Sequence, residues 1–180
     1  MRTFIAIDVP DPIKEKILSV AQEFKNEGTV LVNKDALHIT LLFLGELNEQ
    51  GVERVKESMR SSISFQAFNA AVKGLDFFTP KFIRVVFAKV VEGYQECVSI
   101  YNQITTSLSN EDLAIPDESF VPHITIARVK RVINRQTLLS MIKRYNDIEF
   151  GNFQVSSIKL KSSALTRDGP IYNDLYELKP

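Results

Sequence analysis

Hydrophobic positions along the chain switch repeatedly between the two-residue period of strands and the helical period of about 3.6 residues. The expected strands cover residues 3–8, 29–32, 36–45, 65–77, 82–90, 120–129, 150–161 and 170–178. Helical spacing is expected from about residue 10 to 28, from 48 to 63, from 92 to 108 and from 134 to 145. Asn48 and Asn134 stand where a side-chain oxygen would cap the start of a helix. Together these patterns predict an α+β protein.

The order of these elements repeats along the chain. Helix, strand with the letters HIT, helix, strand and strand occur twice at an offset of 85 residues. The same offset pairs Phe65 with Phe150, Phe68 with Phe153 and Leu75 with Leu160. Two copies cannot stack into a solenoid, so we expect approximate twofold packing. The prediction is one two-lobed domain over residues 1–180, with pseudo-repeats of about 1–90 and 91–180. Two mostly antiparallel sheets would face a central cleft, with the helices outside.

Both histidines of the chain open the same tripeptide, at His38–Thr40 and at His123–Thr125. Because residues i and i+2 of a strand share a face, each strand would present an imidazole beside a hydroxyl. Imidazole has an unperturbed pKa of about 6.5 and can give or take a proton near neutral pH. The expected floor of the cleft therefore consists of His38, Thr40, His123 and Thr125.

Two imidazoles on opposite sides of a phosphate can act as general base and general acid in one displacement. Hydroxyl donors on the same face could stabilise charge on the equatorial oxygens. A 2′,3′-cyclic phosphate suits this arrangement because its leaving oxygen stays tethered and ring opening needs one acid and one base. The alternative is a pair of structural strand histidines, which explains one tripeptide better than two at the repeat offset.

Composition and missing motifs exclude several classes of protein. Lys plus Arg and Asp plus Glu both number 22, so the strong positive field needed to track long nucleic acids is absent. The sequence contains no HExxH or CxxC zinc motif, no glycine-rich phosphate loop and no GxSxG nucleophile elbow. We therefore expect neither a metal ion nor a cofactor. Without a long apolar run, a cytoplasmic protein is the expectation.

Along its whole length the chain resembles the RNA 2′,3′-cyclic phosphodiesterases, also called 2′-5′ RNA ligases, of the two-histidine phosphoesterase superfamily. The matching features are RTFIAID near the start, the HxTx motifs His38–Leu41 and His123–Ile126, FLGE at Phe43–Glu46, Arg128, and GPIY ending at Tyr172. The resemblance implies hydrolysis of a terminal 2′,3′-cyclic phosphate to a 2′-phosphate. It also implies joining of RNA ends through a 2′-5′ linkage as a second activity.

The resemblance also implies roles for individual residues. His38 would protonate the O3′ leaving group, His123 would activate water, and Thr40 and Thr125 would contact the phosphate. Arg128 would bind substrate, yet strict alternation places it on the face opposite His123, so a bulge or strand end is required.

Several other side chains could either contact the substrate or have a purely structural role. Tyr172 and Phe4 could stack on a terminal base or belong to the core. Arg2, Lys81, Arg84 and Lys130 could contact RNA phosphates or be ordinary solvated charges.

Two questions stay open at the level of sequence. The chain could be a non-catalytic module that binds RNA ends, or a phosphodiesterase for 2′-5′ oligonucleotides or ADP-ribose cyclic phosphate. The expected partners are RNA ends or small cyclic-phosphate nucleotides. No membrane and no obligate protein partner are expected, and a monomer is predicted.

Overall fold

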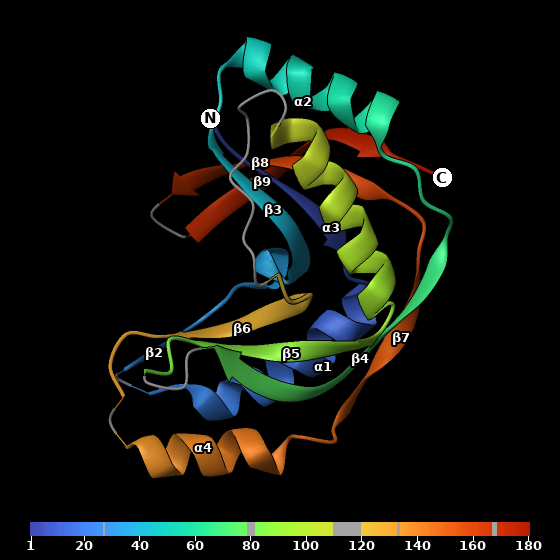
Figure 1. Ribbon diagram of the computed structural model, residues 1–180. Helices are drawn as coiled ribbons and strands as arrows, with labels where there is room; N and C mark the ends of the chain where they lie inside the picture. The colour runs from blue at the N-terminus through green and yellow to red at the C-terminus, as the bar shows by residue number, and fades with distance from the viewer. Residues whose placement is uncertain (27, 79–81, 110–119, 133, 167–168) are drawn as a thin grey trace.

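The computed structural model describes residues 1–26, 28–78, 82–109, 120–132, 134–166 and 169–180. Its strands form two antiparallel sheets that are tilted against each other (Figure 1). Sheet 1 has the order β3 (His38–Glu46), β1 (Arg2–Asp8), β8 (Ile158–Thr166), β9 (Gly169–Leu178). Sheet 2 has the order β2 (Thr29–Leu31), β6 (His123–Val129), β5 (Val85–Glu92), β4 (Phe68–Phe78), β7 (Glu149–Val155). The expected α+β fold with two antiparallel sheets is confirmed.

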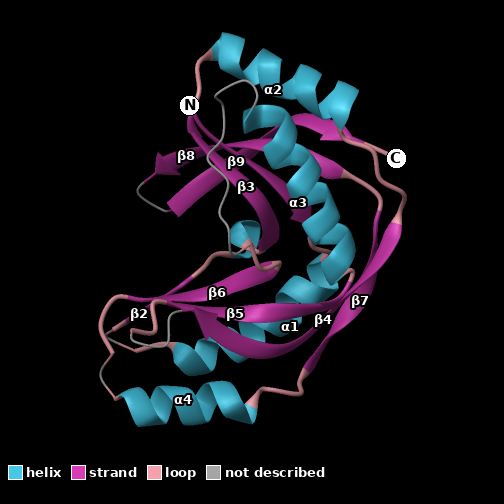
Figure 2. Cartoon of the chain, viewed as in Figure 1, coloured by secondary structure: helices cyan, strands magenta, loops and turns pink. Residues whose placement is uncertain are grey.

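Four α-helices within the described ranges flank the sheets (Figure 2). They are α1 (Asp11–Ala21), α2 (Glu49–Ser62), α3 (Tyr94–Ser109) and α4 (Arg135–Arg144). Helices α1 and α4 pack on sheet 2, whereas α2 and α3 pack on each other and on sheet 1. Short 3₁₀ turns, η1 (Gln22–Phe24) and η2 (Lys34–Ala36), follow α1 and precede β3. None of the helices in the described ranges is long and apolar enough to cross a membrane.

The expected helix caps are present. The side-chain oxygen of Asn48 accepts a hydrogen bond of 2.8 Å from the backbone N–H of Gly51, and that of Asn134 accepts one of 3.0 Å from Thr137. Each cap pairs one of the free N–H groups at the start of its helix. Local chemistry therefore sets where α2 and α4 begin.

A single apolar core lies between the sheets and the helices. Ile39 and Ile124, the middle residues of the two tripeptides, are fully buried in it. Cys97 of α3 is also fully buried, and this burial raises the pKa of its thiol to about 12. The side chain thus packs as a small apolar group.

Some strand bounds differ from the sequence prediction. Residues near 150–161 do not form one continuous strand, because β7 ends at Val155 in sheet 2 and β8 begins at Ile158 in sheet 1. Hydrophobic alternation shows that a segment is extended, but it carries no information about which sheet receives it. Gly45 was expected to end a strand, yet β3 continues to Glu46 through a register shift between Thr3 and Phe4 of β1. The glycine accommodates this with a positive φ of 76°.

Each sheet combines strands from both halves of the chain. Sheet 1 joins β1 and β3 to the late strands β8 and β9, and sheet 2 joins β2, β4 and β5 to β6 and β7. β5 spans the expected repeat boundary near residue 90. Because strands are exchanged in this way, neither sheet is complete without the other half of the chain. The sequence also predicts a polar loop through Pro116, and this segment lies outside the described residues.

Candidate active site

The two HIT strands, β3 in sheet 1 and β6 in sheet 2, contact each other between the two sheets. A cleft of about 280 Å³ lies between them. Its lining includes His38, Thr40, His123, Thr125 and Arg128. The structure therefore brings both expected imidazoles, both expected hydroxyls and the arginine into one cavity.

A bulge in each HIT strand shapes the cleft. In β6, Thr125 pairs with Phe87 and Ala127 pairs with Val86, so Ile126 has no partner across the ladder with β5. In β3, Thr40 pairs with Ala6 and Leu42 with Ile5, which leaves Leu41 unpaired. Two consecutive buried residues follow the threonine in both strands. The extra residue reverses the alternation beyond it.

This reversal places Arg128 on the cleft side of β6. Strict alternation would have placed it on the opposite face. The condition stated from the sequence, a bulge, is thus met. Its charge lowers the pKa of His123, so the guanidinium acts electrostatically on the imidazole. The guanidinium lines the same cleft as the two imidazoles, and guanidinium groups form strong hydrogen bonds with anions.

Backbone carbonyl groups orient both imidazoles. Nδ1 of His123 lies 2.7 Å from the carbonyl oxygen of Val121, and His38 makes a hydrogen bond to the backbone of Asp35. A carbonyl oxygen can only accept, so Nδ1 of His123 carries the hydrogen. In the neutral ring, Nε2 of His123 then keeps its lone pair and can take a proton.

Aromatic rings pack against each imidazole. Phe4 stacks on His38 with 4.9 Å between ring centroids, and Tyr172 meets the same imidazole edge-on at 5.4 Å. Tyr172 is half-buried and does not line the cleft itself, and Phe4 is buried. The structure brings both aromatic residues to His38.

His123 has a matching aromatic environment in sheet 2. Phe78 meets its ring edge-on at 4.7 Å, and Phe87 lies at 5.1 Å. The rings limit the freedom of the imidazole and exclude water from its sides. Sequence reasoning did not single out these two phenylalanines, since aromatic residues in strands are usual in any core.

Burial lowers the pKa of both histidines. Desolvation is the largest cause for His38, whose pKa falls to about 4, and the Lys161 ammonium adds to the effect. The hydrogen bond to Asp35 and the Asp8 carboxylate oppose it. For His123, desolvation again comes first, and the bond to Val121 opposes the shift. Both rings are therefore neutral at pH 7 in the free protein, and an anion in the cleft would favour protonation.

The remaining cleft wall comes from residues that the sequence reasoning did not name individually. They are Val30, Leu31, Val32, Asn33, Ala36, Gly169 and Pro170. Gly169 and Pro170 belong to the GPIY motif, so the family resemblance already pointed to this segment. A Cβ on Gly169 would lie 2.5 Å from Nδ2 of Asn33, and the φ of Gly169 is 120°. Glycine is thus required where β9 approaches the segment before η2.

Arg2, Arg84 and Lys130, the other candidate cations that the structure describes, lie outside this cleft lining. Arg2, at the far end of β1, pairs with Glu46 at 3.8 Å. Arg84 and Lys130 are exposed, and their backbones bond to Val129 and Gly28. Lys81 lies outside the described residues.

A larger open groove of about 670 Å³ runs beside α3 and is a second candidate site by size. Its lining is Ser62, Gln95, Val98, Ser99, Asn102, Gln103, Thr106 and Ser107, with no side chain suited to proton transfer near neutral pH. Among the residues that the structure describes, no group of three His, Cys, Asp or Glu side chains is arranged to hold a metal ion. The smaller cleft with the histidines is the candidate active site.

Solved structures share the fold over nearly the whole chain. The crystal structure of TT0787 from Thermus thermophilus matches with a TM-score of 0.80 and 27% identity, covering 99% of this chain and 97% of that one. Escherichia coli LigT complexed with 3′-AMP matches with a TM-score of 0.81 and 22% identity, covering 99% and 97%. This likeness places the chain among the LigT-like α+β proteins.

Sequence relatives narrow this class to a family. Residues 10–178 match the family described as AKAP7 2′5′ RNA ligase-like domain. The RNA 2′,3′-cyclic phosphodiesterase of Methanocaldococcus jannaschii is 39% identical over 178 residues, covering 98% of this chain and 99% of that protein. The Thermotoga maritima protein of the same name is 36% identical, covering 98% and 94%. The chain belongs to this 2′5′ RNA ligase-like family, as its sequence predicted.

Proposed function

We propose that the protein hydrolyses the terminal 2′,3′-cyclic phosphate of RNA to a 2′-phosphate without a metal ion, using His38 and His123. Family membership makes the chain an enzyme of the RNA 2′,3′-cyclic phosphodiesterase kind. The observation that supports the finer proposal is the meeting of both HxTx motifs in one cleft with Arg128. One copy of the chain supplies all five of these groups, so we infer that a monomer suffices.

The proposed reaction is an in-line displacement at phosphorus. Nε2 of His123 takes a proton from water as the water oxygen forms a bond to phosphorus. The bond from phosphorus to O3′ breaks, and His38 gives its proton to O3′. The phosphate stays on O2′, and the two imidazoles exchange protons with solvent before the next cycle.

The other three groups would bind and stabilise the phosphate. The hydroxyls of Thr40 and Thr125 lie on opposite walls and would donate hydrogen bonds to its non-bridging oxygens. Arg128 would neutralise charge that the attacking oxygen brings to the phosphate. These contacts would be preorganised, since the strands hold them before substrate arrives.

The acid and base labels come from family resemblance, since the two walls carry the same motif. His38 must be protonated to act as the acid, although burial holds its pKa near 4 in the free protein. The negative charge of the cyclic phosphate would raise that pKa as it enters. Substrate binding and protonation of His38 are therefore coupled in the proposed cycle.

A second activity follows from the same chemistry. If the 5′-hydroxyl of another RNA replaces water, the same displacement breaks the bond to O3′ and leaves a 2′-5′ phosphodiester. His123 would take the proton of the 5′-hydroxyl, and His38 would again protonate O3′. We propose this ligation as a second reaction of the same cleft.

The experiment is incubation of a short RNA bearing a 2′,3′-cyclic phosphate with the protein in excess EDTA, followed by phosphorus NMR. His38→Ala and His123→Ala are compared with Thr106→Val, a control on α3 away from the cleft. We expect a 2′-phosphate from the unmodified protein and the control, and a loss of at least about 10³-fold in each histidine variant.

Other results would redirect the proposal. A 3′-phosphate would reverse the leaving group, and loss of activity in EDTA would reveal a required metal. Binding of the RNA without turnover would favour the non-catalytic module. Turnover only of 2′-5′ oligonucleotides or of ADP-ribose cyclic phosphate would assign a different substrate to the same histidines.

A further inference from the structure

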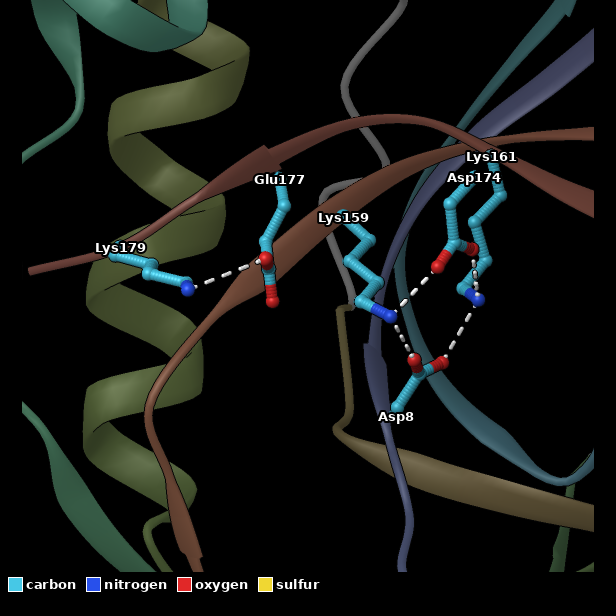
Figure 3. Close-up of polar contacts among 6 residues, drawn as sticks. All are labelled: Asp8, Lys159, Lys161, Asp174, Glu177 and Lys179. Carbon is cyan, nitrogen blue, oxygen red and sulfur yellow. Dashed lines mark hydrogen bonds and ion pairs between the residues drawn. The ribbon is translucent and has the colours of Figure 1, made fainter.

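Four charged side chains form a closed ring on sheet 1 (Figure 3). Lys159 of β8 lies 2.8 Å from Asp8 of β1 and 2.6 Å from Asp174 of β9. Lys161, two residues further along β8, makes contacts of 2.8 and 2.6 Å with the same two carboxylates. Each ammonium thus bridges both carboxylates, and the ring spans three strands.

The ring shares the cleft face of sheet 1 with His38. Directly paired residues of antiparallel strands point to the same side of a sheet. Asp8 pairs with His38, and Lys161 pairs with both Phe4 and Asp174. The ring therefore lies on the same face of sheet 1 as the His38 imidazole. It does not belong to the apolar core on the opposite face.

The aromatic contacts of His38 depend on the strands that the ring joins. Phe4, stacked on the imidazole, comes from β1, whereas Tyr172, at its edge, comes from β9. Tyr172 also meets Phe4 edge-on at 5.5 Å. In sheet 1, β8 lies between β1 and β9, and β9 forms the edge opposite β3. Tyr172 can reach His38 only while β9 keeps its place relative to β1.

We propose that the ring of Asp8, Lys159, Lys161 and Asp174 is a positioning device for His38, because it fixes β9 against β1 and so holds Phe4 and Tyr172 around the imidazole. The catalytic part of this inference rests on the proposed function. In this proposal none of the four side chains contacts the substrate. They act through the two aromatic rings and through their own charges.

The balance of charge supports this role. Lys161 is only 10% exposed, and a cation so buried is costly unless it is paired. Desolvation by itself would raise the pKa of Asp8 and Asp174. The hydrogen bonds and charges of the two lysines together outweigh it, so the pKa of each carboxyl is lowered and both carboxylates stay ionised. Pairing with both aspartates raises the pKa of Lys159. The ring has no net charge and offers no unpaired cation to a phosphate.

Charges from three elements act on His38. Lys161 of β8 and Lys14 of α1 lower its pKa, whereas Asp8 of β1 raises it. Tyr172 of β9 faces it with a hydroxyl whose pKa is raised by burial, so this group is neutral at pH 7. Removing the Lys161 ammonium should therefore raise the pKa of His38. His123 is not among the groups on which the ring acts.

The test uses Lys161→Met and Asp174→Asn, with Lys161→Arg as the conservative variant and Lys73→Met as the matched control. Lys73 forms a cross-strand ion pair with Glu149 in sheet 2, between β4 and β7. Kinetics on a 2′,3′-cyclic phosphate RNA are measured beside NMR of the histidine ring carbon-bound protons. With two histidines in the chain, the signals are assigned by His38→Gln.

In Lys161→Met and Asp174→Asn we expect kcat to fall by roughly 10- to 100-fold with KM changed less than about threefold, because a misplaced acid slows the chemical step. The ring-current shifts of His38 should shrink, and those of His123 should stay. In Lys161→Met, the pKa of His38 should also rise. Lys161→Arg should restore most of kcat, and Lys73→Met should leave every readout unchanged.

Unchanged His38 signals and kcat in both ring variants, or equal changes at His38 and His123, would overturn the inference. Should Lys161→Met fail to fold, Asp174→Asn decides, because it leaves Lys161 paired with Asp8. The NMR signals require no turnover, so they test the placement of His38 even if the unmodified protein proves inactive. Inactivity of the unmodified protein would contradict the proposed function alone.

Discussion

Arg128 lies on the same side of β6 as His123, although five positions separate them, because Ile126 is left unpaired in the ladder with β5. The two side chains converge on one cleft, and the charge of the arginine lowers the pKa of the imidazole. The one-residue bulge thereby places the Arg128 guanidinium and the His123 imidazole on the same side of β6. Phe43, five positions after His38, follows the corresponding bulge in β3 and carries no charge. The two walls of the cleft are therefore chemically different.

Replacing Arg128 by Met should lower kcat/KM for a cyclic phosphate by about 10²-fold, because the cleft loses the cation that we propose to bind the phosphate. The pKa of His123 should rise, since Arg128 lowers it in the folded protein. Steady-state kinetics and NMR titration of His123 measure the two effects. Arg84→Met is the control, because Arg84 does not line the cleft. Equal losses in the two variants would argue against a specific role for Arg128.

The histidines of the free protein should titrate below pH 6.5, with His38 near pH 4, because burial disfavours the imidazolium. Adding a 2′-nucleoside monophosphate should raise both pKa values, since a bound phosphate supplies the opposite charge. Proton NMR of the ring hydrogens across a pH series measures them. A free-protein pKa of 6.5 or above for His38 would contradict the burial argument.

Stability should fall as the pH drops from about 6.5 to about 4. In this window unfolded His38 takes up a proton that the folded ring, with its pKa near 4, does not. The loss should be on the order of 2–3 kcal/mol in the free energy of unfolding. Denaturant unfolding at several pH values measures it, and His38→Gln should flatten the dependence in this window. Below about pH 4 a further loss is expected, because the lowered pKa values of Asp8 and Asp174 make their protonation unfavourable to the fold.

Thr40→Val and Thr125→Val should each lower kcat by roughly 10- to 100-fold, because valine keeps the shape of threonine and removes the hydroxyl donor. KM should change less, since charge on the non-bridging oxygens is greatest in the transition state. Kinetics on the same cyclic-phosphate RNA separate the two constants. Thr106→Val on α3 is the control for a Thr-to-Val change outside the cleft. An unchanged kcat in both cleft variants would remove the threonines from the mechanism.

Much of this protein follows from local rules that act within a few residues of sequence. Asn48 and Asn134 cap their helices because a side-chain oxygen beside free N–H groups acts locally. The placement of His38 with Thr40, and of His123 with Thr125, follows from the two-residue period of a strand. The repeat offset predicted that these two strands would meet, and they line one cleft.

Only the tertiary structure decided the rest, because it depends on which strands become neighbours. The bulge at Ile126 arises in the pairing with β5, and it brings Arg128 into the cleft. The separation of β7 from β8, and the ring that links Asp8 to Asp174, need strands brought together from distant parts of the chain. Burial lowers the pKa of His38 only after Phe4 and Tyr172 have packed around it. Periodicity records the direction of each side chain along its own strand, whereas register, burial and charge pairing are properties of several strands together.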